Sequence, residues 1–350
     1  MPDDLNLLAY AGTAPSLAGT PRHAGAGHAL IGRISLGVAT WIAQGAVIRA
    51  DGNYVRGGGD LYLGPRATVH IAHDLYPTLI GERVTIGQYA VAHACEIGDD
   101  CVIEERAVVL DGAVLEPGVV LAADAVVFSR ARLPGGFVYS GRPAKPEREL
   151  RAGELQVRRA ALRERIERTA GAPHPRFDLR EPLDASVFVA NTATLRGDID
   201  AHARVNIWYG CDLDAGGGQI VIGERSNVQD NSLLACTPGG RIEIGIDSTV
   251  GHNVRMEDCS VGDRCLVGIG SVVARDTRFE DDSFLAAGAI TAPGQVLTSG
   301  FLWGGQPARK LAPLDERKKT LITETIVTYC AYADELQRVQ KLATAGVQRR

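Results

Sequence analysis

Aliphatic residues recur at every sixth position through most of this 350-residue chain. A period of six fits neither an α-helix, whose faces repeat about every 3.6 residues, nor a β-strand, whose side chains alternate between two faces. Six-residue repeats are typical of a parallel β-helix, in which three hexads form one triangular coil and residues eighteen positions apart stack on the same face. The recurring residues, which we expect to fill the interior, are Leu30, Leu36, Ile42, Ile48, Ile97, Ile103, Val109, Leu115, Leu121, Val127, Val189, Leu195, Ala201, Ile207, Leu213, Val261, Val267, Val273, Phe279 and Leu285.

The hexads occur in two copies of one larger unit. Corresponding residues lie 164 positions apart: Gly81 and Gly245, Cys95 and Cys259, Cys101 and Cys265, and the closing segments GRPAK at 141–145 and GQPAR at 305–309. Each copy then runs into a charged amphipathic segment. In the second segment, apolar residues spaced three or four positions apart predict a helix that packs back along the prism, and they are Ile322, Ile326, Tyr329, Ala333 and Leu336.

We therefore expect an all-β protein with C-terminal helices, built from two parallel β-helix domains that are each followed by an α-helix. A segment with three prolines, GAPHPRFDLREPLDAS, separates the two copies and predicts a linker. The expected ranges are an N-terminal arm at 1–26, the first β-helix domain at 27–146, a helix at 147–172, the linker at 173–184, the second β-helix domain at 185–311 and the C-terminal helix at 312–345.

Charge and composition argue against nucleic-acid and membrane partners and favour a cytoplasmic location. A formal net charge of −5 gives no basic surface for nucleic acid. The acidic N-terminus lacks a basic region followed by an apolar core, and no run of about 18 apolar residues occurs, so we expect no membrane span and a cytoplasmic, soluble protein. Seven cysteines would stay reduced there, and we interpret the repeated pairs 95/101 and 259/265 as small buried side chains.

Several phrases of both copies resemble the γ-class carbonic anhydrase family. In the second copy they are VNIWYG, SNVQDNSLLA, VGHNVRMEDCSVGD and QPARKL, and in the first they are GAVIRAD, VTIGQYAVAHACEIGD and RPAKP. The resemblance covers roughly residues 28–170 and 185–340. It implies left-handed β-helices that assemble as trimers, with each metal site between two prisms: two histidines come from one prism and the third from its neighbour. An arginine, an aspartate and a glutamine complete the expected site.

In the first copy, the resemblance implies Arg49, His70 and His93 as site residues. His70 follows Arg49 by twenty-one residues, which is the family's spacing between its arginine and its first histidine. The family's next two histidines fall five apart in a VGHxxxxH phrase. That phrase is IGQYAVAH here, so Gln88 replaces one histidine while His93 is kept.

The second copy keeps the complementary residues. Its phrase VGHNVRME retains His252 but has Glu257 in place of the other histidine, and the arginine and the first histidine are replaced by Asp214 and Ala235. The glutamine-containing phrase survives as Asn227, Gln229 and Asp230, where the first copy has Tyr62, Gly64 and Pro65.

Hexad counting supports the same division without the family. Arg49, His70 and His93 each follow a core residue, which places them in one exposed column of the first prism. The same count places Gln229 and His252 in another column of the second prism, on the face that precedes the first column. Each copy has kept one column and lost the opposite one, whereas random loss would be scattered. Facing the two retained columns builds one composite site from His70, His93 and His252.

Three imidazoles with an open fourth position are typical of a catalytic rather than a structural Zn²⁺, and Fe²⁺ or Co²⁺ would also fit. Such an ion lowers the pKa of its bound water to about 7 and supplies metal-bound hydroxide. We expect Gln229 to orient this hydroxide and Arg49 to pair with Asp51 or Asp230. The resemblance implies hydration of CO₂ to bicarbonate, or attack on a related small carbonyl compound.

Four alternatives stay open at this point. His73 is the ligand in place of His70 if the family's spacing from Arg49 to its first histidine contains a gap in this chain. The protein is otherwise an acyltransferase that uses coenzyme A, with His93 or His252 as the general base, or a non-catalytic scaffold. We also expect a homo-oligomer, in which the composite site forms either within one chain or between chains.

Overall fold

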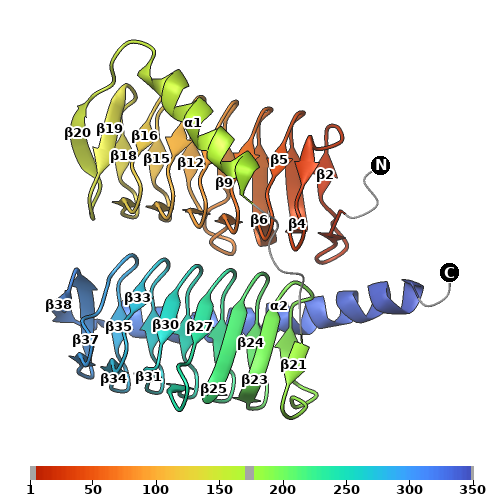
Figure 1. Ribbon diagram of the computed structural model, residues 1–350, viewed down its shortest axis with the longest axis vertical. Helices are drawn as coiled ribbons and strands as arrows, with labels where there is room; N and C mark the ends of the chain where they lie inside the picture. Colours follow the sequence, from red (N-terminus) through yellow and green to blue (C-terminus); the bar gives the residue numbers. More distant parts are fainter. Residues whose placement is uncertain (1–4, 170–176, 348–350) are drawn as a thin grey trace. The chain divides into compact units, whose positions relative to one another are not determined.

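The computed structural model describes residues 5–169 and 177–347, which form two compact units, Met1–Pro173 and His174–Arg350. Each unit is a left-handed parallel β-helix, a stack of triangular coils whose strands are mostly two or three residues long, with one helix along its side (Figure 1). The expected fold class is therefore confirmed.

Unit 1 contains β1 (Leu7–Leu8), β2 (Ser16–Leu17), β3 (His23–Ala24), β4 (Ala29–Leu36), β5 (Trp41–Ile42), β6 (Val47–Gly57), β7 (Tyr62–Leu63), β8 (Thr68–His70), β9 (Thr78–Ile80), β10 (Thr85–Ile86), β11 (Val91–His93), β12 (Glu96–Ile97), β13 (Val102–Ile103), β14 (Val108–Val109), β15 (Val114–Leu115), β16 (Val120–Leu121), β17 (Val126–Val127), β18 (Arg132–Leu133), β19 (Phe137–Ser140), β20 (Lys145–Glu149) and α1 (Glu154–Arg168).

Unit 2 contains β21 (Phe177–Leu179), β22 (Phe188–Val189), β23 (Thr194–Ala201), β24 (Asn206–Ile207), β25 (Asp212–Ile222), β26 (Asn227–Val228), β27 (Leu233–Ala235), β28 (Arg241–Ile244), β29 (Thr249–Val250), β30 (Arg255–Glu257), β31 (Ser260–Val261), β32 (Leu266–Val267), β33 (Val272–Val273), β34 (Arg278–Phe279), β35 (Phe284–Leu285), β36 (Val296–Leu297), β37 (Phe301–Gly305), β38 (Ala308–Pro313) and α2 (Glu316–Val347).

Strand register confirms the hexad interpretation of the core. Ile97 lies beside Leu115 on the next coil, and Leu115 lies beside Leu133 on the one after, so each step adds eighteen residues. All the recurring aliphatic residues are buried except Val189, which is half-buried in the first strand of its stack. Parallel backbone hydrogen bonds hold each coil on the next, and the aliphatic columns exclude water from the interior.

Arginine and aspartate side chains form ion-pair ladders at the coil corners. The corner residues adopt left-handed backbone conformations, with φ of 57° at Arg83 and 60° at Asp100. Because successive corners stack, Arg83 Nη2 lies 2.8 Å from Asp100 Oδ2, and Arg106 Nη2 lies 2.6 Å from Asp124 Oδ2. Exposed pairs of this kind contribute only about 0–1 kcal/mol each, so the aliphatic core remains the main source of stability.

Each helix covers one outer face of its own unit. Leu162 and Ile166 of α1 pack against Val102 and Val120, the outward residues of β13 and β16. In unit 2, α2 contacts β22, β24 and β29. The apolar residues expected on one face of this helix are buried, and they are Ile322, Ile326, Tyr329, Ala333 and Leu336.

The structure differs from the sequence-based ranges at three places. Residues 5–26, expected as an arm, instead contribute β1, β2 and β3, because Leu7 and Leu8 pair in parallel with β4 and extend the stack. Residues 145–149 and 308–313 are strands that hydrogen-bond antiparallel to β19 and β37, so both helices begin later than expected. Within the expected linker, β21 pairs with β23, while residues 170–176 lie outside the described residues.

No helix in the described part of the chain is both long and apolar enough to cross a bilayer.

We predict that Ile103→Ala lowers the free energy of unfolding by about 2–5 kcal/mol, because it leaves a cavity at a fully buried position in the coil interior. Denaturant unfolding of the purified protein measures the change. Val157→Ala on the exposed side of α1 is the control and should change this free energy by less than about 0.5 kcal/mol. Equal unfolding curves for the two variants would contradict the assigned core.

Candidate functional site

The column predicted in unit 1 is formed by β6, β8 and β11. Register pairs Ile48 with Val69, and His70 with His93, so Arg49 precedes the two histidines on successive coils of one outer face. His73, the alternative ligand, is exposed in the turn after β8 and does not occupy this register position. The gapless count from Arg49 to His70 therefore agrees with the strand register.

These side chains join in one polar network within unit 1. Arg49 forms an ion pair with Asp51, and the second oxygen of Asp51 lies 3.1 Å from Nε2 of His70. Nδ1 of His70 is 3.2 Å from Nε2 of His93, whose Nδ1 is 2.6 Å from Asp111 Oδ1. Carboxylates therefore occupy the outer nitrogens of both rings, and the two inner nitrogens face each other.

Arg49 and Asp51 are buried, whereas hexad counting predicts an exposed column. A buried charge is costly unless an opposite charge compensates it, and the Arg49–Asp51 pair meets this requirement. Asp51 is one of the two partners that the sequence analysis left open for Arg49.

In unit 2, His252 lies in the turn after β29, beside Asp230 in the turn after β26. Its Nδ1 is 3.1 Å from Asp230 Oδ2, and its Nε2 is 3.3 Å from the hydroxyl of Tyr329 on α2. Asp230 also accepts a hydrogen bond from the backbone N–H of Tyr209, which fixes the carboxylate. His252 and Asp230 are fully buried.

Gln229 does not share a column with His252, contrary to the sequence analysis. Val228 pairs with Val250, so the residue beside Gln229 on the next coil is Gly251, and His252 lies beside Asp230. The count misplaced His252 because this histidine is the second residue after its core position, not the first. The Gln229 amide donates to Asn227 Oδ1 at 3.2 Å, in a buried polar row along the α2-covered face.

The column of unit 2 that corresponds to Arg49, His70 and His93 carries arginine–carboxylate ion pairs. Arg196 reaches Asp214 at 2.8 Å, and Ala235 is next in register. Glu257 follows and pairs at 2.7 Å with Arg275 on the coil beyond. Ala235 and Glu257 are exposed, and the carboxylates at 214 and 257 are held by arginines, so this column contains no cluster of imidazoles.

Sequence reasoning missed two residues that contact the histidines, Asp111 and Tyr329. Asp111 lies eighteen residues after His93, the nominal length of one coil, and this spacing was the signal that could have identified it. Tyr329 was assigned to the apolar face of its helix, but its hydroxyl extends past that face to His252.

The donor set of these residues fits a divalent transition metal. Two nitrogens bound to one tetrahedral Zn²⁺ at about 2.0–2.1 Å are about 3.3 Å apart, close to the 3.2 Å between His70 Nδ1 and His93 Nε2. Metal-binding histidines usually donate their other N–H to a carboxylate or carbonyl group. Asp51 and Asp111 are placed to accept such hydrogen bonds from His70 and His93, and the Asp230 carboxylate lies 3.1 Å from Nδ1 of His252.

The repeated cysteines are unsuited to nucleophilic or ligand chemistry. Burial raises the pKa of both Cys101 and Cys265 to about 12 and that of Cys95 and Cys259 still further above the ordinary value. At neutral pH these four thiols are protonated, which agrees with their assignment as buried fillers.

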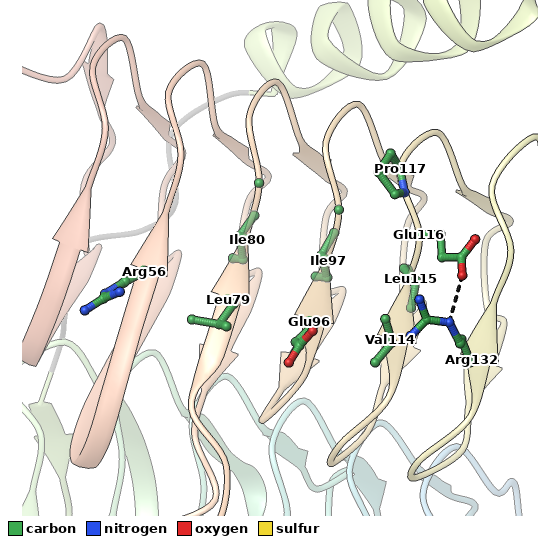
Figure 2. A pocket seen from close by; sticks show the side chains of 12 residues that line it. Arg56, Leu79, Ile80, Glu96, Ile97, Val114, Leu115, Glu116, Pro117 and Arg132 are labelled. Atoms are coloured by element: carbon green, nitrogen blue, oxygen red, sulfur yellow. Dashed lines mark hydrogen bonds and ion pairs between the residues drawn. The ribbon is translucent and has the colours of Figure 1, made fainter.

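A surface groove of about 370 Å³ lies elsewhere on unit 1, along β9, β12 and β15 (Figure 2). Leu79, Glu96 and Val114 line it on successive coils, and the Arg132–Glu116 ion pair, at 2.7 Å, closes one end. None of the predicted site residues lines this groove, and we assign no chemistry to it.

Comparison with known proteins gives relatives under several names, among them γ-carbonic anhydrases and an uncharacterized transferase. No family model matches the chain. It is 31% identical over 159 residues to "Gamma carbonic anhydrase 1, mitochondrial" of Arabidopsis thaliana, a match that covers 44% of this chain and 58% of that protein. The chain thus spans less than two thirds of the plant relatives it matches. It is also 31% identical over 168 residues to "Protein YrdA" of Escherichia coli (strain K12), covering 46% of this chain and 91% of the relative.

Among solved structures, one from Desulfovibrio desulfuricans G20, described as an acetyltransferase, is 14% identical. It has a TM-score of 0.51, and the match covers 87% of this chain and 68% of that one. At this identity the likeness shows the fold alone.

We predict that thiol reagents at neutral pH leave Cys95, Cys101, Cys259 and Cys265 unmodified in the native protein, because these thiols are buried and protonated. Mass spectrometry of the labelled, digested chain maps the modified positions. Cys236 is half-buried and should react first, and all seven cysteines should react after denaturation. Rapid native labelling of any of the four would refute their role as fillers.

Proposed function

Because this chain belongs to the γ-carbonic-anhydrase-like hexapeptide-repeat proteins, we propose that it is a metal-dependent enzyme with one three-histidine site per chain. The proposed ligands are His70 and His93 of unit 1 and His252 of unit 2. The observation that carries the proposal is that the copies differ in a complementary way. Unit 1 holds two imidazoles whose facing nitrogens are 3.2 Å apart, and unit 2 holds one imidazole beside Asp230, with Ala235 and two arginine–carboxylate pairs in its other column.

Three imidazole ligands would leave a fourth position open for water, and Zn²⁺, Fe²⁺ and Co²⁺ all accept such a set. When bound, the ion would act as a Lewis acid that lowers the pKa of its bound water to about 7. The proposed reaction is the hydration of CO₂ or attack on a related small carbonyl compound. In the hydration, the water oxygen bonds to the carbon of CO₂ and one proton is released, which gives bicarbonate.

The protein's own residues would orient the ligands and compensate charge. Asp51 accepts from the outer nitrogen of His70, the Asp230 carboxylate lies 3.1 Å from Nδ1 of His252, and Arg49 balances the buried charge of Asp51. The Tyr329 hydroxyl is 3.3 Å from Nε2 of His252, so a hydrogen-bonding group lies next to the nitrogen proposed to bind the metal. We assign to the buried Gln229 the orientation of the reacting water.

A second candidate function is acyl transfer from coenzyme A. It is favoured by the 2.6 Å contact between His93 and Asp111, since a histidine held by a carboxylate is the usual form of a general base. A general base needs no metal. Resistance of the activity to chelators would therefore distinguish this candidate from the metalloenzyme.

The proposal also includes a homo-oligomer in the cytoplasm, with small molecules as its only substrates. The third ligand comes either from the same chain or from a second copy.

We predict about one equivalent of zinc, iron or cobalt per chain in protein purified after expression with metal supplied. Elemental analysis before and after chelation provides the measurement. A symmetrical pair of sites would give about two equivalents instead. Metal-free protein under these conditions would reject the metalloenzyme and favour acyl transfer or a scaffold.

We predict that His70→Ala and His252→Ala lose metal to the same extent and lower the rate of CO₂ hydration together, because each removes one of three ligands of a shared ion. Metal content and stopped-flow hydration assays provide the readouts. His202→Ala is the control, since this exposed histidine lies 3.6 Å from Asp200 on the surface. Metal loss in only one of the two ligand variants would rule out a shared site.

A further inference from the structure

The two copies differ together at a pair of positions one coil apart. In unit 1, His93 Nδ1 lies 2.6 Å from Asp111 Oδ1. The residues 164 positions later are Glu257 and Arg275, and they also pair, with Arg275 Nη2 at 2.7 Å from Glu257 Oε1. Both copies thus pair an acidic residue with a basic one at these two positions. The acidic residue is at the second position in unit 1 and at the first position in unit 2. In each copy, the residue at the second position can therefore pair with the residue at the first, as Asp111 pairs with His93.

The hydrogen bond from His93 determines which of its nitrogens is available. A neutral imidazole carries one N–H, and a carboxylate can only accept. Donation from Nδ1 to Asp111 leaves the lone pair on Nε2, the nitrogen that faces Nδ1 of His70 at 3.2 Å. Asp51 does the same for His70 from the other direction, by accepting from its Nε2.

We propose that Asp111 is a positioning residue of the metal site, which holds His93 in the tautomer and ring orientation that present Nε2 to the ion. This assignment rests on the proposed function. In unit 2 the same position carries a cation, which could not accept from an imidazole, and the same position as His93 carries a carboxylate that the cation neutralises. The second copy has therefore replaced ligand and positioning residue as one unit.

A purely structural role does not account for this carboxylate. Asp111 is 40% exposed, whereas the His93 side chain is 13% exposed. Partly exposed ion pairs add little to stability, and the corner itself is held by backbone hydrogen bonds, including Gly112 N–H to Ala94 C=O at 2.7 Å. The effect of Asp111 is therefore directed at the ring of His93.

The test compares Asp111→Ala, Asp111→Asn and, as the matched control in the other copy, Arg275→Ala in the full chain. Competition with a chromophoric chelator gives the affinity for Zn²⁺, and the visible absorption of Co²⁺ reports ligand geometry. Loss of a hydrogen bond to a metal ligand typically weakens metal affinity 10–100-fold. We expect that loss and an altered Co²⁺ spectrum for Asp111→Ala, a smaller loss for Asp111→Asn, which retains an acceptor oxygen, and no change for Arg275→Ala.

Thermal unfolding of the metal-free proteins separates folding from binding, and all three variants should match the wild type. If Asp111→Ala does not fold, the Asp111→Asn spectrum decides. If the wild-type protein binds metal and the Asp111 variants have the same Zn²⁺ affinity and Co²⁺ spectrum, the assignment of Asp111 is overturned but the proposed function is not. A wild-type chain that binds no metal would overturn the proposed function and this assignment with it.

Discussion

The parallel hydrogen bonding of one coil on the next is the constraint on which every other feature depends. Because the aliphatic residues of each hexad must point into the prism, the position of every other side chain relative to the core is fixed. Register then sets His70 beside His93 on neighbouring coils. Any insertion between coils must loop outward, so the columns on the outer faces stay aligned and can collect functional groups from distant parts of the chain.

Duplication allowed the two copies to divide one arrangement between them. In unit 1, a buried arginine, two aspartates and two histidines compensate one another in a continuous chain of contacts. In unit 2, the same face carries exposed arginine–carboxylate pairs, which need no partner and no metal to satisfy their charges. His252 and Asp230 remain instead under α2, where Tyr329 completes their surroundings. Each copy is thus internally consistent in charge, although neither holds all three of the proposed ligands His70, His93 and His252.

Much of the fold could be predicted because burial of a six-residue period has few physical solutions. Ile97, Leu115 and Leu133 occupy the stacked interior positions that the period requires, and the apolar face of α2 follows from its spacing. The first coil was missed because Leu7–Leu8 and Ser16–Leu17 are too short to show a period, and they form strands only by pairing with β4. The later starts of both helices have a similar cause, since an antiparallel strand competes for the residues that precede each helix.

For the site, the sequence by itself determined which histidines each copy retains and which of them share a face, because hexad counting follows from burial alone. Only the tertiary structure decided which ring nitrogens are held by carboxylates, that Arg49 pairs with Asp51, and that His252 lies beside Asp230 rather than Gln229. These contacts depend on side-chain rotamers, on corner geometry and on the position of a helix distant in sequence. A one-dimensional period specifies the face of a residue, but the angle and length of a hydrogen bond exist only once the coils are stacked.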